Sequence, residues 1–433
     1  MKKGIRFVRN TLLSCIEEVG KKSEKYVFRP GKDYSRERKM SFSGLIRSVI
    51  SLEGGSLSKE LLHVCTKKHE WISKSGFCQQ REKVRPEAFE SVFHSFTEKA
   101  LRNAKKYNGY RIFACDGSDI SFRTKDKTIS FQSCDDGKTY GLLHLNLLYD
   151  LLNHVYTDCV IQTKRQCNEP RACIEMLYRK GLFGKAILLA DRGYEGYNLL
   201  MHLQTLGCFY AIRVKDIDSI GIASRLQVPA TDEFDTAYTL ILTRKSIKHD
   251  PRPNLVRINP RKAFDFIEKG SKAECKLKFR LVRFQIKEGL YEVLITNLDA
   301  CNWSMDDLKA LYNMRWGIET SVRDLKYPIG LNCFHSLKTD FILQEIFARL
   351  ITYNFCQLII GRIDVPALNR KNDCKINFSA AASVCKEYLK YNNYSPQQIK
   401  LLIIRCLEPN RPGRQYKRKN IRHRVVGLSY RVA

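Results

Sequence analysis

The 433-residue sequence contains no long uninterrupted apolar run. Five polar residues break its most apolar stretch, 341–360: Gln344, Glu345, Arg349, Asn354 and Gln357. A membrane-spanning helix needs about 18 or more consecutive apolar residues, so the sequence argues against a transmembrane protein. The first residues hold only a short apolar stretch before Glu17 and Glu18, and we expect no signal peptide there.

Cysteine pairs with metal-site spacing are also missing. The 16 cysteines are scattered, none forms a C-x2-C pair, and several lie inside apolar runs: Cys115, Cys356 and Cys406. This pattern favours reduced, mostly buried thiols in a cytosolic protein over a zinc module or a disulfide framework.

Acidic residues are few, since 45 Asp and Glu face 75 Lys and Arg, which gives a net charge of +30. An excess of that size indicates a polyanionic partner. Nucleic acid is the first candidate, and an anionic membrane surface is the weaker one.

One segment, YNMRWGIETSVRDLK at 312–326, gathers residues suited to phosphate chemistry. On a helix, Tyr312, Arg315, Glu319 and Lys326 fall within roughly 60° of one face. The carboxylate can bind a divalent metal while the two cations contact phosphate oxygens. The alternative is a solvated helix face with an ordinary Arg–Glu pair.

Two aspartates follow short apolar runs typical of buried strands. Asp116 ends RIFACD and precedes Gly117, which suggests a turn, and Asp191 ends KAILLAD. In α/β folds the carboxyl ends of strands carry the chemistry, although an Asp before a glycine can be a plain turn. With Glu319, these aspartates could hold two Mg²⁺ or Mn²⁺ ions about 3.5–4 Å apart.

The pattern Y-x2-R-x3-E-x6-K, together with CDGSDI, ADRGY and VLITNL (293–298), resembles the DDE transposases of bacterial insertion sequences, and most nearly the insertion-sequence-four family. The resemblance covers about residues 30–365. It implies a ribonuclease-H-like core, a catalytic triad of Asp116, Asp191 and Glu319, and Mg²⁺-dependent strand transfer. It also implies that three further residues contact the DNA end: Tyr312, Arg315 and Lys326.

The patterns predict an α/β protein with a ribonuclease-H-like mixed sheet. We expect a helical N-terminal DNA-binding region (1–105), a first core segment (106–214), a β-rich insertion (215–300), a second core segment (301–365) and a basic C-terminal region (366–433). The N-terminal region could hold a helix-turn-helix that presents Gln79, Gln80, Arg81 and Lys83 to DNA, or it could be an ordinary helical bundle.

Further candidate DNA contacts lie outside the motifs. Arg192 follows Asp191 and could touch the DNA backbone or simply pack. From Arg244 to Lys287 there are 14 basic and 4 acidic residues, and strand alternation predicts four cations on an exposed face: Lys276, Lys278, Arg280 and Arg283. They could contact DNA or only protect a sheet edge. The cation-rich segment 409–424 suggests a basic arm.

These features favour a DNA transposase that cleaves element ends and joins them to target DNA, as at least a homodimer on double-stranded DNA. Two alternatives stay open: a catalytically silent transposase-derived DNA-binding protein, and a ribonuclease-H-like nuclease that cuts without joining.

Overall fold

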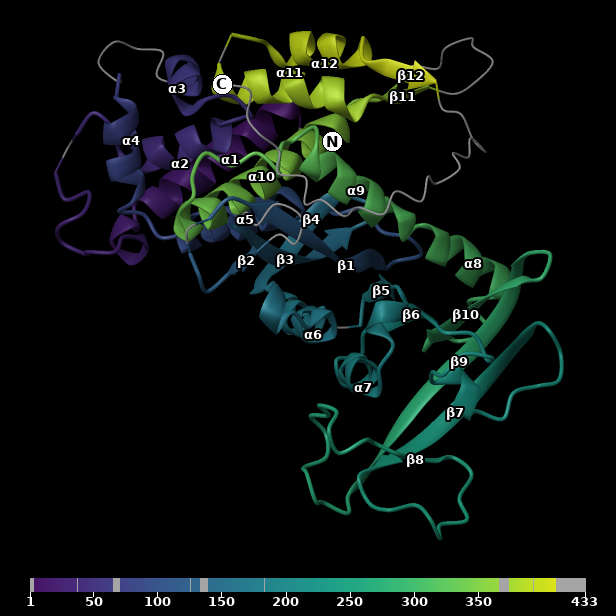
Figure 1. Ribbon diagram of the computed structural model, residues 1–433. Helices are drawn as coiled ribbons and strands as arrows, with labels where there is room; N and C mark the ends of the chain where they lie inside the picture. The colour runs from purple at the N-terminus through teal and green to yellow at the C-terminus, as the bar shows by residue number, and fades with distance from the viewer. Residues whose placement is uncertain are drawn as a thin grey trace.

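A single mixed sheet of ten strands organises the molecule. The computed structural model describes residues 4–36, 38–64, 71–124, 126–132, 139–182, 184–365, 374–391 and 393–409. Helices cover both faces of the sheet in Figure 1. The segment 410–433, with most of the predicted basic arm, lies outside the described residues.

Five strands form the core of the sheet: β1 (Arg111–Phe122), β3 (Thr139–Asp150), β4 (Val155–Thr163), β5 (Ala186–Ala190) and β6 (Phe209–Val214). They lie in the order β4-β3-β1-β5-β6. The pairs β1–β3 and β3–β4 are antiparallel, whereas β1–β5 and β5–β6 are parallel. A short strand, β2 (Ser130–Gln132), pairs with the beginning of β3. The predicted ribonuclease-H-like mixed sheet is confirmed.

The β-rich insertion continues this same sheet. Its strands are β7 (Phe234–Thr243), β8 (Leu255–Arg257), β9 (Glu274–Lys287) and β10 (Leu290–Thr296). Strand β10 pairs antiparallel with β6 and with β9, and β9 pairs with β7. The long antiparallel pair β7–β9 projects from the core as an arm (Figure 1).

One face of the core sheet is covered by α6 (Glu169–Lys180) and α7 (Tyr197–Thr205), and the other by a larger helical layer (Figure 1). The larger layer contains α1 (Ile5–Gly20), α2 (Phe42–Ser51), α3 (Leu57–Val64), α4 (Lys74–Arg81), α5 (Glu87–Ala100), α10 (Thr339–Ile360), α11 (Phe378–Lys390) and α12 (Pro396–Ile404). A small sheet of β11 (Cys374–Ile376) and β12 (Leu407–Pro409) joins the last two helices.

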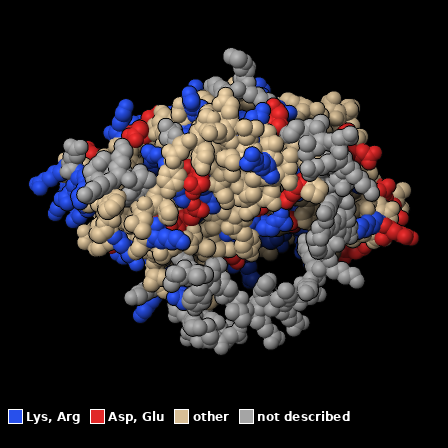
Figure 2. Space-filling view, turned by 90° about the horizontal axis from the view of Figure 1, so that it is seen from above, with Lys and Arg blue, Asp and Glu red and all other residues tan. Residues whose placement is uncertain are grey.

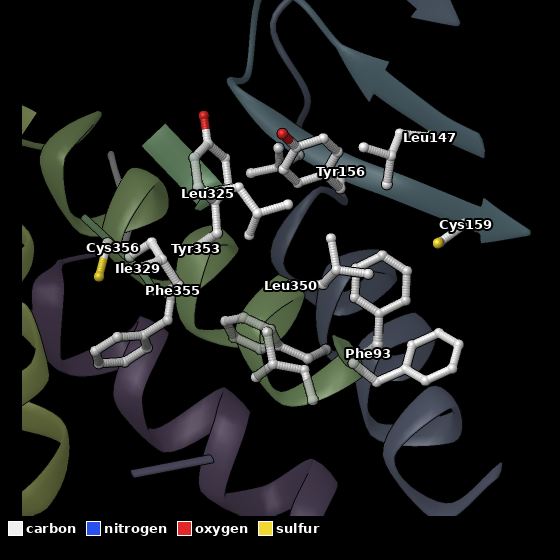
Figure 3. Close-up of a cluster of buried hydrophobic side chains, with 14 of the residues drawn as sticks. Phe93, Leu147, Tyr156, Cys159, Leu325, Ile329, Leu350, Tyr353, Phe355 and Cys356 are labelled. Carbon is white, nitrogen blue, oxygen red and sulfur yellow. The ribbon is translucent and has the colours of Figure 1, made fainter. Parts of the chain in front are cut away.

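Strand alternation divides the apolar residues between two cores. On β1, Ile112 and Ala114 belong to the core under the larger helical layer, whereas Phe113 and Cys115 belong to the core under α6 and α7. In Figure 3, Phe93 and Leu350 lie in the first of these cores with strand residues such as Leu147. The sheet is thus buried on both faces, which explains the nearly continuous apolar runs of its parallel strands.

Helix α10 is buried almost all round, and its polar residues have internal partners. Its Glu345 forms a salt bridge of 2.9 Å with Arg81, whose side chain is only 1% exposed. The suggestion that Arg81 faces DNA is therefore wrong, because its guanidinium neutralises a buried carboxylate instead. Within the described residues, no helix combines the length and apolar character needed to cross a bilayer.

Candidate active site

Asp116 lies in the middle of a strand. The sequence suggested that the chain turns at Gly117, but β1 continues to Phe122, and Asp116 is opposite Leu147 of β3. Gly117 is needed for a different reason. A Cβ on it would lie 2.4 Å from His144 Nε2 and 2.5 Å from Glu169 Oε1. The glycine keeps open the space into which these two side chains point.

Asp191 follows β5 directly, as the strand pattern predicted, and begins the single turn η4 (Arg192–Tyr194). Since β1 and β5 are parallel neighbours with Ala114 opposite Leu189, the same register places Asp116, in the middle of β1, level with Asp191 at the end of β5. The Oδ1 atom of Asp191 is buried and accepts no hydrogen bond from any residue that the structure describes. Among the described residues, the nearest cationic atom to this oxygen is Arg213 Nη1 at 3.8 Å, which is beyond hydrogen-bonding distance.

The signature segment forms two helices instead of one. Tyr312 is on α8 (Met305–Asn313), whereas Glu319 and Lys326 are on α9 (Trp316–Lys326). Arg315 lies at the junction, where backbone N–H groups donate to carbonyls three residues earlier and tighten the chain. The predicted single helix face is therefore interrupted, yet its residues still meet at the carboxylates.

The positive charge of Arg315 acts on all three carboxylates. Arg315 donates a 2.8 Å hydrogen bond to Glu319, and its side chain is only 3% exposed. Burial disfavours its charged form, but Tyr312, Glu319 and Asp191 outweigh this and raise the pKa of Arg315. The same guanidinium acts on Asp116. One buried cation is thus close enough to influence carboxylates from β1, β5 and α9.

Asp116 carries the clearest electrostatic signature of the site. The pKa of Asp116 is raised to about 6, mainly by burial and also by the charges of Glu319 and Glu169, although the Gly117 N–H and Arg315 act to lower it. A bound cation would stabilise the charged form of such a carboxyl group. With the unpartnered oxygen of Asp191, this makes the donor set suitable for a divalent metal.

The other signature residues contact the site from its rim. The Tyr312 side chain is buried, and its hydroxyl donates to the carbonyl of Ala190, immediately before Asp191, at 3.4 Å. Lys326 Nζ donates to the carbonyl of Asp119 at 2.9 Å. Both residues therefore brace the strands that carry the aspartates, and their contact with DNA stays a prediction.

The predicted basic surface of the insertion is correct for two residues only. Lys276 and Lys278 are exposed, but Arg280 and Arg283 are buried. Arg280 pairs with Asp235 and Arg283 with Asp216. The exposed face predicted for these two arginines is wrong, because β9 lies between β7 and β10 and its guanidinium groups neutralise acids from neighbouring segments.

Sequence reasoning missed Glu169, which begins α6. Its Oε1 is 3.0 Å from His144 Nε2, and its Oε2 lies 3.6 Å from the position that a Cβ on Gly193 would take. Strand β4 runs in the same direction as β1, since both are antiparallel to β3. The residues after β4 therefore reach the same edge as Asp191. That topological relation could have identified Glu169.

A family model for the transposase DDE domain matches residues 107–355, which is more than half of the chain. The chain belongs to the DDE transposase family. The match confirms the resemblance to DDE transposases, while the insertion-sequence-four branch stays a prediction. DDE transposases act on DNA and use divalent metal ions, so the family supports the general function and the need for a metal inferred from the sequence.

No curated protein sequence matches the chain. Among solved structures, the chain is similar to a piggyBac transposase synaptic complex with hairpin DNA, with 11% sequence identity and a TM-score of 0.47. The similarity covers 96% of this chain and 88% of that one.

Proposed function

We propose that this DDE transposase binds the terminal inverted repeats of its element, cleaves DNA strands there and transfers the ends to target DNA. Asp116, Asp191 and Glu319 are proposed as catalytic carboxylates that hold two Mg²⁺ or Mn²⁺ ions. The observation that supports this most directly is the place of Arg315, which donates a hydrogen bond to Glu319 and whose charge acts on Asp191 and Asp116 as well. The insertion-sequence-four family, a homodimer on DNA and a cytoplasmic location belong to the same proposal.

The metal ions would supply electrostatic stabilisation and nucleophile activation for an in-line attack on phosphorus. The chain itself supplies the rest. The carboxylates hold fixed positions because β1 and β5 are buried on both faces, and α9 is seated by a 2.8 Å hydrogen bond between Ser321 and Tyr156. Arg315 compensates part of the negative charge before metal and DNA arrive.

DNA has several positively charged surfaces available. Arg192 is exposed beside Asp191, and it lines a cavity of about 750 Å³ between α6, α7 and the insertion. The triad does not line this cavity. Its cationic residues are Arg171, Arg192, Lys215, Arg225, Arg257 and Lys262. We propose that DNA next to the scissile phosphate follows this surface, with Lys276 and Lys278 as more distant contacts.

A second basic region lies on the N-terminal side. In Figure 2, Lys and Arg gather at the left end, where Figure 1 places α4. The segment between α1 and α2 contributes several exposed cations: Arg29, Lys32, Arg36, Arg38 and Lys39. This distribution supports DNA binding by the helical N-terminal region.

The decisive test incubates the protein and Mg²⁺ with labelled DNA that contains the element ends on either side of the gene. The variants Asp116→Asn, Asp191→Asn and Glu319→Gln are expected to bind the DNA and to lose cleavage and joining. Asp306→Asn, an exposed site on α8, is the control and keeps both. Normal cutting by any triad variant would remove that residue from the proposed site.

The same assay separates the two alternatives. Cleavage without joined products indicates a nuclease, and binding without cleavage by the wild type indicates a silent DNA-binding protein.

A further inference from the structure

A second group of metal-ligand side chains lies beside the candidate triad. His144 of β3, Cys167 and Glu169 place one possible ligand atom each within 4.8 Å of one another. They come from three segments: a central strand, the connection after η3 (Lys164–Gln166) and the first turn of α6. None of these residues belongs to the carboxylate set proposed for catalysis.

The hydrogen bonding of His144 favours a positively charged species between His144 and Glu169. Its Nδ1 lies 2.6 Å from Asp119 Oδ1, and its side chain is only 4% exposed. When Nδ1–H donates to Asp119, Nε2 presents a lone pair. The Nε2 atom is 3.0 Å from Glu169 Oε1, which is also an acceptor, and within the described part of the chain Nε2 makes no hydrogen bond of acceptable geometry. A positive species between the two atoms would remove this repulsion.

The nearby thiol favours a metal ion as that species. Imidazole, thiolate and carboxylate together form a ligand set suited to Zn²⁺. At Zn–ligand distances of about 2.0–2.3 Å, tetrahedral geometry separates neighbouring ligand atoms by roughly 3.3–3.8 Å. The group needs shifts of only a few tenths of an ångström up to about 1 Å to reach that range. The Asp119–His144 contact is the carboxylate–histidine arrangement that commonly orients a metal-bound imidazole.

The neighbouring glycines give the site its space. A side chain on Gly117 would occupy the position between His144 Nε2 and Glu169 Oε1. Gly193, two residues after Asp191, is close to the same carboxylate, since a Cβ on it would lie 3.6 Å from Glu169 Oε2. An ion held here would therefore tie the first turn of α6 to β3, and to β1 through the contact between His144 and Asp119, close to Asp116 and Asp191.

We propose that His144, Cys167 and Glu169 form a binding site for a Zn²⁺-type transition-metal ion, with one coordination position open to water or a phosphate oxygen. The ion fixes the connection from β4 to α6 against the core sheet. This site differs from the triad because it contains a thiolate and an imidazole, which bind Zn²⁺ and Co²⁺ far better than Mg²⁺.

The test uses the full-length protein, stripped with a chelator and reloaded with Co²⁺ alone. Wild type is expected to bind one equivalent with a thiolate-to-cobalt charge-transfer band in the near ultraviolet. Cys167→Ser should lose the band, whereas Cys301→Ser, at an exposed cysteine outside the group, should keep it. Asp119→Asn should weaken Co²⁺ binding by about 10–100-fold.

Two results would overturn the site. A wild-type protein without the band would mean that His144 is a protonated imidazole held between Asp119 and Glu169. An unchanged band in Cys167→Ser would place the metal on other cysteines. Asp191→Asn separates this site from the proposed catalysis, since it should keep the band while losing DNA cleavage. Far-ultraviolet circular dichroism of each variant checks that the fold is retained.

Discussion

Replacing Asp116 by Asn should stabilise the metal-free protein at alkaline pH. The pKa of Asp116 is raised from 3.8 to about 6, mainly by burial. A group whose pKa is higher in the folded state favours folding while it is protonated, and this contribution is lost as the pH rises through the folded-state pKa. Asn cannot ionise, and its side-chain oxygen can still accept the hydrogen bond that Gly117 donates to Asp116.

The size of this stability difference follows from the shift in the pKa of Asp116. About two pKa units, at about 1.36 kcal/mol each, correspond to about 3 kcal/mol near pH 8. Near pH 5 the wild-type group is mostly protonated when folded, and the advantage of Asn falls to roughly half of that value. The difference between variant and wild type should therefore grow as the pH rises between these limits.

Urea unfolding in the presence of EDTA measures this difference, with Asp306→Asn as the control for a general loss of negative charge. Adding Mg²⁺ should then stabilise wild type more than Asp116→Asn, because the ion relieves the charge that the variant lacks. If Asp116→Asn is no more stable than wild type near pH 8, or if its advantage grows toward acid pH, the electrostatic account of the site is refuted.

Three further predictions concern the surroundings of the site. Gly117→Ala should abolish DNA cleavage because its Cβ collides with His144 and Glu169, whereas Gly196→Ala, which meets no atom within 4 Å, should cleave normally. Arg280→Ala should lower the free energy of unfolding by about 1–3 kcal/mol because it removes the buried donor to the carbonyls of Leu298 and Trp303. Lys278→Ala should change it by less than about 0.5 kcal/mol, and urea unfolding of both variants tests this. The double variant Lys276→Ala and Lys278→Ala should reduce the log–log salt dependence of DNA binding by about two units if each lysine contacts a phosphate.

The order of the core elements could be read from the sequence because buried strands leave continuous apolar runs. The apolar runs before Asp116 and Asp191, which the sequence predicts as buried strands, lie in β1 and β5. The end of β1 could not be read in this way. Asp116 and Gly117 resemble a turn locally, and only the partners on β3 and α6 show why a glycine lies inside a strand.

The errors at Arg280 and Arg283 have a different origin. The prediction extended along β9 the alternation that correctly exposes Lys276 and Lys278. The acids that pair with the two arginines, however, lie 45 residues from Arg280 and 67 residues from Arg283 in the sequence. Charge counting records the excess of cations without showing which are already neutralised. Contacts of that range are decided by the pairing of β9 with β7 and β10, and no local pattern encodes this pairing.

Contacts between segments distant in sequence also hold the carboxylates of the candidate site close together despite their mutual repulsion. Asp116 and Glu319 repel each other, and a cluster of this kind would separate if its members were mobile. The two aspartates cannot move apart because β1 and β5 are paired and packed on both faces. Glu319 is held by α9, whose Leu325 is fully buried in the core and whose Ser321 bonds to Tyr156. Apolar packing therefore sustains the raised pKa of Asp116, and a divalent ion would offset both the cost of burying its charge and the repulsion from Glu319.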